Sequence, residues 1–307
     1  MSAAAEMTAG IEPARSDEVR LLDGADRARP GRLAQAGRRL RRRPGALAGA
    51  VVILLFIAVA LLAPVIAPAD PNEISRDRRA APSADHLFGT DDIGRDVLSR
   101  VIYGARVSLR VGLVSIGIAL TAGSLLGIVA AYAGGWLDSI IMRVMDVMLA
   151  FPGILLAIAI VAILGPSLFN VMIAVGIEAI PVYTRTARAS TLTVKELEYV
   201  IGARALGCRH GRIILRHILP NVVAPLIVLA TIGVAGSILT AAGLSYIGLG
   251  AQPPTAEWGA MLSAARNFLR DAWWMATFPG VAIMLVVLAL NLFGDGLRDI
   301  LDPRLRD

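Results

Sequence analysis

Residues 45–67 read GALAGAVVILLFIAVALLAPVIA, an apolar stretch without a single charged residue. A helix needs about 20 apolar residues to cross the hydrocarbon core of a bilayer, so this stretch predicts a first membrane-spanning helix. The sequence is 56% hydrophobic and 18% charged over 307 residues, and its charges gather outside such stretches. Because a spanning segment must satisfy its backbone internally, these features predict an all-α integral membrane protein.

Five further apolar stretches bring the predicted number of transmembrane helices to six. The third contains Arg143 and Asp146 near its start, three residues apart on one helix face, which favours a surface ion pair between them. The fourth contains Glu178. The five stretches are residues 107–133, 140–164, 168–184, 222–249 and 277–293.

The basic residues predict the orientation, because segments that stay in the cytoplasm carry an excess of Arg and Lys. Eight Arg residues precede the first span within 27–43, and seven basic residues lie within 185–216. Both regions are therefore expected in the cytoplasm, with an even number of spans between them. We predict a multi-pass protein of the cytoplasmic (inner) membrane with both termini cytoplasmic. Its parts would be a tail 1–44, a first helix 45–67, an extracytoplasmic segment 68–106, a five-helix core 107–298 and a tail 299–307.

The stretch KELEYVIGARALGCRHGRIILRHILPN, residues 195–221, is too polar to span a membrane and too regular for an irregular loop. Apolar residues recur at helical spacing up to Gly207, a common helix stop, and a second apolar set precedes Pro220. The pattern predicts two short amphipathic helices on the cytoplasmic face. The residues alone leave open whether this pair anchors to anionic lipid or docks another protein.

The same stretch resembles the Glu-Ala-Ala loop of ABC importer permeases, which ends in a hydrophobic residue followed by Leu-Pro. The resemblance implies a coupling helix that fits a cleft on an ATPase subunit. Small side chains in it would permit close helix contact. The aligned residues here are Ile201, Gly202, Ala203, Gly207, His217, Leu219, Pro220 and Asn221.

One position departs from the family pattern, because Ile201 stands where the family has Glu. Glu198 lies one helical turn earlier, on about the same face. Our hypothesis is that Glu198 partly replaces the missing carboxylate.

Three further stretches resemble the C-type permease of dipeptide, oligopeptide and nickel ABC importers. They are HLFGTDDIGRD (86–96), GLGAQPPTAEWG (248–259) and NLFGDGLRD (291–299) followed by Asp302-Pro303. Within the first, Asp91, Asp92 and Asp96 do not match the calcium-loop spacing, so turn and cap chemistry is the better interpretation.

The resemblance implies the type I ABC importer permease fold and an ATP-driven, binding-protein-dependent import of peptides or related solutes such as nickel chelates. The expected partners are a second, B-type permease chain, one or two ATPase subunits, an extracytoplasmic substrate-binding protein and the lipid bilayer. The binding protein is expected to meet the loop formed by Gln252, Pro253, Pro254, Glu257 and Trp258, with Trp258 suited to the bilayer interface.

Several functions are not expected. No phosphate-binding loop is present, so ATP and Mg²⁺ are expected on the ATPase subunit and no cofactor on this chain. No catalytic or metal-ligating constellation is found, so we expect a non-enzyme without a metal. The net charge of +6 comes from Arg residues beside apolar spans, which argues against nucleic acid. Glu178 is a candidate for the pathway, and a proton-coupled secondary transporter that uses it is the alternative.

Overall fold

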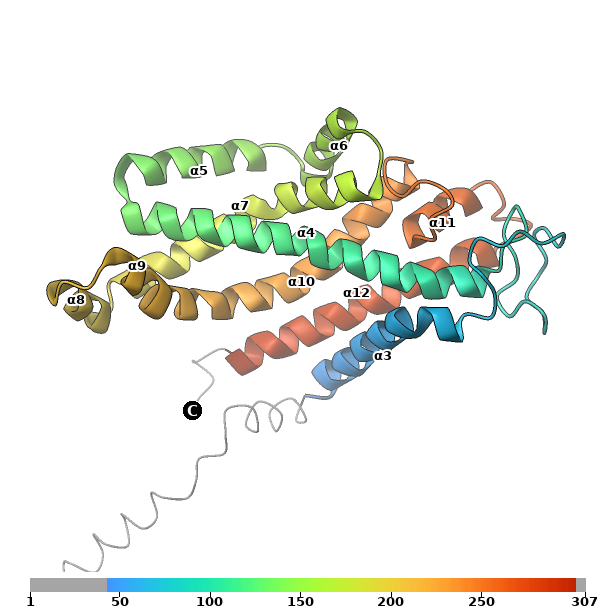
Figure 1. Ribbon diagram of the computed structural model, residues 1–307, viewed down its shortest axis with the longest axis horizontal. Helices are drawn as coiled ribbons and strands as arrows, with labels where there is room; N and C mark the ends of the chain where they lie inside the picture. Colours follow the sequence, from blue (N-terminus) through green and yellow to red (C-terminus); the bar gives the residue numbers. More distant parts are fainter. Residues whose placement is uncertain (1–42, 302–307) are drawn as a thin grey trace, which may run out of the picture. The chain divides into compact units, whose positions relative to one another are not determined.

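The computed structural model describes residues 43–301, in which nearly all regular structure is helical. Most of the predicted tails, 1–44 and 299–307, lies outside the described residues. Figure 1 shows the helices in chain order. Their bounds are α3 Pro44–Ile66, α4 Val97–Ala133, α5 Gly135–Leu149, α6 Gly153–Leu164, α7 Leu168–Lys195, α8 Glu198–Ala205, α9 His210–Ile213, a π-helix Ile214–Ile218, α10 Leu219–Tyr246, α11 Trp258–Ala265 and α12 Trp274–Leu301.

Five helical stretches are long and apolar enough to cross a bilayer: α3, α4, α7, the continuous run His210–Tyr246 and α12. A sixth span is obtained when the bent pair α5 and α6 is taken as one. The predicted all-α membrane class is therefore confirmed. The second half of the 195–221 loop is not a separate helix, because α9 and the π-helix lead directly into α10.

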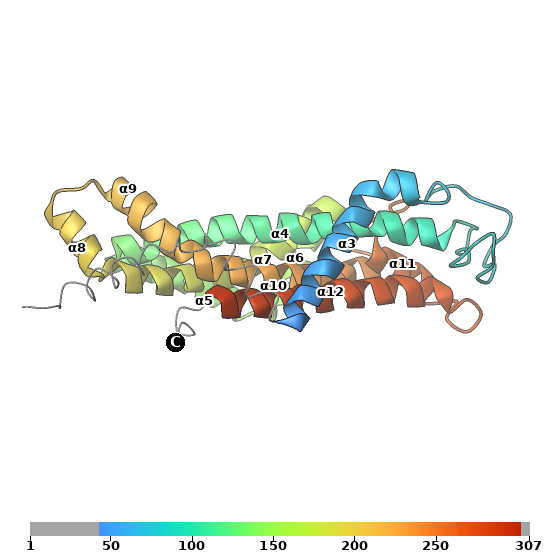
Figure 2. The same ribbon diagram turned by 90° about the horizontal axis from the view of Figure 1, so that it is seen from below.

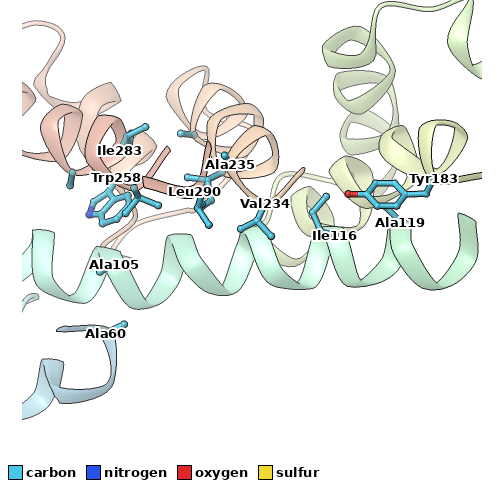
Figure 3. Close-up of a cluster of buried hydrophobic side chains, with 14 of the residues drawn as sticks. Ala60, Ala105, Ile116, Ala119, Tyr183, Val234, Ala235, Trp258, Ile283 and Leu290 are labelled. Atoms are coloured by element: carbon cyan, nitrogen blue, oxygen red, sulfur yellow. The ribbon is translucent and has the colours of Figure 1, made fainter. Parts of the chain in front are cut away.

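Helix α4 lies at the centre of the bundle and packs against α3, α7, α10 and α12. Figure 3 shows side chains from α7 and α10 meeting α4 in one apolar cluster, where Ile116, Tyr183 and Val234 are buried. Two glycines of α4 allow the closest approach. A methyl group on Gly127 would meet the carbonyl oxygen of Thr184, and one on Gly123 would meet the Tyr183 side chain. The GxxxG pair therefore packs α4 onto α7 within one chain.

The third predicted span, 140–164, is broken rather than straight. Its two halves, α5 and α6, meet at an angle of 93°. The physical reason is Pro152, which directly precedes α6 and cannot continue the hydrogen bonding of α5. Figure 1 shows α5 running alongside α4 and α7, whereas α6 is turned across that direction near the beginning of α7.

Two ion pairs join α5 to α7. Arg188 donates to both carboxylate oxygens of Asp138, each at 2.6 Å, and Arg185 donates to Asp146 at 2.6 Å. The expected pair between Arg143 and Asp146 is wrong, because Asp146 bonds across to α7 instead. An antiparallel neighbouring helix offered a better partner than the next turn of the same helix.

The irregular segments gather at the two opposite ends of the bundle (Figure 2). One end carries residues 67–96 together with residues 247–273, which include α11, and we call this set the capping layer. The other end carries α8 and α9, which belong to the 195–221 loop. The two regions for which the sequence suggested functions therefore lie at opposite ends of the described helices.

Candidate functional site

Helix α8 presents an apolar face that nothing in the described part of the chain covers. Val200 points inward and is 0% exposed, whereas Ile201 is 51% exposed. Leu206, directly after α8, is 87% exposed. Contact with another protein or with lipid would remove these two side chains from water.

The small residues of the loop leave this face open. A methyl group added to Gly202 would find no atom within 4 Å, and the same holds for Gly207. Gly207 ends the α8 turn with a φ of +74°, a backbone angle that favours glycine. Gly202 and Gly207 are thus free to let another helix approach closely, and Ala203 lies half-buried between them.

Glu198 and Ile201, the two positions compared in the sequence, are both exposed. Glu198 is the first residue of α8, where the helix dipole favours a negative charge. No described basic side chain forms an ion pair with it, so its carboxylate remains available to a partner.

The 195–221 loop is tied to the bundle by two tyrosines that sequence reasoning missed. Tyr132, at the end of α4, lies 2.8 Å through its hydroxyl from Nδ1 of His210. The guanidinium carbon of Arg204 lies 5.8 Å from the Tyr132 ring centroid. Tyr132 and His210 are 78 residues apart in the chain, and no local pattern signals such a contact.

The second tie joins α8 to α10. The Asn221 side-chain amide donates to the hydroxyl of Tyr199 at 3.1 Å and to the carbonyl oxygen of His217 at 2.7 Å. His217 is half-buried and its ring lies 5.8 Å from that of Tyr199. Among the remaining predicted loop residues, Leu219 is half-buried and Pro220 is exposed.

The capping layer contains a cavity of about 460 Å³. Both segments of the layer line it: residues 67–96 provide Asp92 and Arg95, and residues 247–273 provide Gln252, Pro253 and Arg266. Gln252, Pro253 and Pro254 are exposed at its edge. The cavity is therefore open to a partner from the end of the bundle opposite to α8.

A buried charge network shapes the floor of this cavity. Asp91 and Arg100, at 5% and 4% exposure, lie 3.7 Å apart, and Arg95 donates to Asp91 at 2.6 Å. Arg100 also donates to the carbonyl oxygen of Pro71 at 2.8 Å. Asp96 accepts from the backbone N–H of Ser99 at 2.8 Å and caps α4. Asp91 also accepts from the backbone N–H groups of Ile93 at 3.1 Å and Arg95 at 2.9 Å, so the predicted turn and cap roles are confirmed for Asp91 and Asp96.

Two residues expected on the binding-protein-facing loop are buried. Glu257 is 2% exposed, and its carboxylate accepts from the backbone N–H groups of Gly259 at 3.0 Å and Ala260 at 2.8 Å, which caps α11. Burial raises the pKa of Glu257 above its ordinary value, although these two hydrogen bonds oppose the shift.

Trp258 is 0% exposed, so its expected place at the bilayer interface is wrong. Its indole N–H donates to the carbonyl oxygen of Val101 at 3.0 Å. Gly104 leaves room for the ring, because a methyl group there would come within 2.5 Å of it. Figure 3 shows Trp258 directed at α4 near Ala105. A buried hydrogen-bond acceptor and a large apolar pocket suited this indole better than a lipid headgroup region.

Glu178 lies on α7 beside the break between α5 and α6. Its carboxylate sits against Gly153, the first residue of α6, where an added methyl group would collide with Oε1. Arg185, further along the same helix, is paired with Asp146. Glu178 is therefore a half-buried carboxylate at the start of a short membrane helix.

Two known protein families match parts of this sequence. The family described as binding-protein-dependent transport system inner membrane component matches residues 123–307. The family described as N-terminal TM domain of oligopeptide transport permease C matches residues 31–82.

Curated relatives match along most of their length. The dipeptide transport system permease protein DppC of Alkalihalophilus pseudofirmus is 49% identical, over 89% of this chain and 90% of its own. The di/tripeptide transport system permease protein DppC of Pseudomonas aeruginosa is also 49% identical, over 86% and 89%. The glutathione transport system permease protein GsiD of Pectobacterium atrosepticum is 48% identical, over 88% and 90%.

Among solved structures, the inward-facing MetNI methionine ABC transporter superposes with a TM-score of 0.54 at 19% identity, over 65% of this chain and 95% of that chain. At this identity the likeness shows a shared fold. Sequence and fold agree, and they favour an importer subunit over the proton-coupled alternative. The chain therefore belongs to the family of binding-protein-dependent transport system inner membrane components, as a multi-pass permease subunit of an ABC importer that is not itself catalytic.

Proposed function

We propose that this chain forms half of the pathway of an ATP-driven importer of short peptides, and that α8 docks the ATPase subunit. The observation that carries the docking is the uncovered apolar face of α8, with Leu206 87% exposed and Ile201 51% exposed. The peptide substrate is supported by relatives at 48–49% identity that are named for dipeptides, di/tripeptides and glutathione.

The ATPase would supply the energy. ATP and Mg²⁺ bind that partner, and this chain holds no cofactor of its own. A second permease, a different B-type chain, completes the pathway. Closure of the ATPase pair pushes the 195–221 loop and tips the helices to open the pathway outward. The apolar face of α8 would bind the ATPase firmly enough to follow this movement, because large side chains buried at the centre of an interface carry most of its binding energy.

The capping layer would receive the substrate-binding protein. Gln252 and Pro253 line the cavity and are exposed, as is the neighbouring Pro254, while Glu257 and Trp258 are buried within the same layer. In this proposal the capping layer lies outside the membrane and α8 in the cytoplasm, with both termini cytoplasmic. Glu178 then lies within the membrane beside α6, where a carboxylate without a basic partner suits the amino group of a passing peptide.

The docking is tested by co-purification of the tagged chain with its candidate ATPase in detergent. Leu206→Glu places a charge at the centre of the proposed contact. Loss of such an anchor weakens binding by about 2 kcal/mol or more, roughly 30-fold. Ile74→Glu is the matched control, because Ile74 is 61% exposed but lies in the capping layer. Leu206 is a cleaner test than Gly207, where any side chain would strain the backbone.

We expect the wild type and Ile74→Glu to retain the ATPase and Leu206→Glu to lose it. Equal retention by all three would reject docking through α8.

The substrate class is tested separately, by uptake of a labelled dipeptide into vesicles that contain the whole importer. ATP-dependent uptake that an unlabelled nickel chelate does not compete would establish the peptide substrate, and competition by the chelate alone would reject it.

A further inference from the structure

Tyr132 connects the 195–221 loop to the end of α4. Its hydroxyl lies 2.8 Å from Nδ1 of His210 on α9, and its ring faces the guanidinium of Arg204 on α8 at 5.8 Å. One side chain thus touches both short helices of the loop. Lys195 strengthens the junction, because its ammonium group donates to the carbonyl oxygen of Ala131 at 3.1 Å, at the end of α4.

Helix α4 differs from the other spanning helices in its continuity. It runs for 37 residues without a proline, a length of about 55 Å at 1.5 Å per residue. Each of the other described spans contains a proline or a break: Pro64 in α3, the break before α6, Pro181 in α7, Pro225 in α10 and Pro279 in α12. Prolines and breaks are where helices bend, so α4 is the span best able to move as one rod.

The far end of this rod reaches the cavity of the capping layer. Asp96 caps α4 there, and Arg100, one turn into the helix, lines the cavity and is bonded to Asp91 and to the Pro71 carbonyl. Trp258 holds the same part of α4 through its hydrogen bond to the carbonyl oxygen of Val101. A displacement of α4 at Tyr132 would therefore reach the cavity walls.

The second tie of the loop leads to a less rigid helix. Tyr199 bonds to Asn221, but this part of α10 follows the π-helix Ile214–Ile218 and is followed by Pro225. A π-turn disrupts regular helix geometry and frequently marks a functional site. Motion entering through Tyr199 can be absorbed within these turns before it crosses the membrane.

We propose that Tyr132 is a positioning residue that transmits movement between the 195–221 loop and the capping-layer cavity, with α4 as the rod. A loaded binding protein on the cavity would signal to the ATPase through this contact, and ATPase closure would open the cavity by the same route. This inference rests on the proposed docking of the ATPase on α8, but Tyr132 itself lies outside the docking face.

The test uses the whole importer in lipid nanodiscs, with the substrate-loaded binding protein added. Tyr132→Phe removes the hydroxyl contact with His210 but keeps the ring beside Arg204, and Tyr132→Leu removes both. Three quantities are measured: retention of the ATPase subunit, ATP hydrolysis without binding protein, and the stimulation of hydrolysis by loaded binding protein. Tyr103→Phe is the matched control, because Tyr103 lies on the same helix and its hydroxyl bonds to no described residue.

We expect both Tyr132 variants to retain the ATPase and hydrolyse ATP alone as the wild type does. Stimulation should fall about two- to tenfold in Tyr132→Phe, the range of one hydrogen bond, and further in Tyr132→Leu. Tyr103→Phe should behave as the wild type, and Tyr199→Phe should lose less stimulation than Tyr132→Phe.

Wild-type stimulation in Tyr132→Leu would overturn the inference, and so would a larger loss in Tyr199→Phe, which would assign transmission to α10. Loss of ATPase retention in the Tyr132 variants would also overturn it, because the contact would then only shape the docking face. Failure of the wild-type chain to retain the ATPase is a different result, which rejects the proposed docking itself.

Discussion

Trp258 in the capping layer is 0% exposed and Arg100 beneath it 4%, whereas Ile201 and Leu206 at the α8 end are 51% and 87% exposed. The capping layer buries Trp258 completely, although Ile74 and Trp273 of the same layer remain exposed at 61% and 52%. The α8 end buries Val200 but leaves Ile201 and Leu206 outside, and hydroxyl contacts from two tyrosines tie it to the bundle. The difference fits the two proposed roles, a receiving surface that is built on a buried indole at one end and a docking surface that carries exposed apolar side chains at the other.

The largest expected effect tests whether the capping layer is indeed held by its core. Trp258→Ala removes a fully buried indole and its hydrogen bond to Val101, which should lower the free energy of unfolding by about 3–5 kcal/mol. The measurement is the apparent melting temperature in detergent. Trp273→Ala is the matched control, since Trp273 is 52% exposed and should lose less than about 1 kcal/mol. Equal losses in the two variants would show that burial does not distinguish these positions.

A smaller effect is expected at the start of α4. Asp96→Ala removes an acceptor for the Ser99 backbone N–H and hydroxyl, at 2.8 and 2.9 Å, and the 3.1 Å contact to His86. Loss of an N-cap should lower the free energy of unfolding by about 1–2 kcal/mol, read as a lower melting temperature. Asp85→Ala serves as the control, because Asp85 is exposed and accepts no hydrogen bond from the described residues. An unchanged melting temperature for Asp96→Ala would show that this cap does not stabilise the capping layer.

The pH dependence of the capping layer follows from Glu257. Burial raises its pKa above the ordinary 4.5, so the folded chain binds this proton more tightly than the unfolded chain does. The stabilisation is complete below the ordinary pKa and is lost as the pH rises through the raised pKa. Glu257→Gln cannot titrate, so the wild-type melting temperature should gain on that of the variant as the pH falls from neutral toward 4.5.

The control for this titration is Glu73→Gln, at an exposed position of the same layer. Its melting temperature should follow the wild type at every pH. Parallel curves for the wild type and Glu257→Gln would contradict a raised pKa. A wild type that loses stability relative to Glu257→Gln as the pH falls would show that folding lowers the pKa of Glu257 instead of raising it.

The sequence predicted the features that rest on local pattern. Apolar length located the spans, and the Gly207 stop with its periodic neighbours located α8. Asp91 and Asp96 were correctly interpreted as turn and cap residues, because that chemistry acts over two to four residues of chain. Family resemblance, rather than periodicity, decided between lipid anchoring and protein docking.

Features that depend on tertiary contact could not be predicted in this way. Residues 140–164 were predicted as one continuous span, whereas α5 and α6 meet at 93° and α6 packs against α7. An indole suits a membrane interface as well as a buried pocket, and only Gly104 beneath it selects the pocket for Trp258. Tyr132 carried no signal, because its partner is 78 residues away.

The smallest expected effect concerns Glu198, the residue that could supply the carboxylate missing at Ile201. Both side chains are exposed on α8, and the carboxylate has no ionic partner among the described residues. An exposed ion pair across an interface contributes little, so Glu198→Gln should weaken ATPase retention by at most about fivefold.

Salt distinguishes this ion pair from the apolar contact at Leu206, because screening weakens exposed charge pairs and leaves apolar burial intact. The difference in retention between the wild type and Glu198→Gln should therefore shrink as the salt concentration rises, while the defect of Leu206→Glu persists. Identical retention in the wild type and Glu198→Gln at low salt would show that α8 docks through its apolar face alone. The substitution at Ile201 would then mark a coupling helix that has exchanged a charge contact for a hydrophobic one.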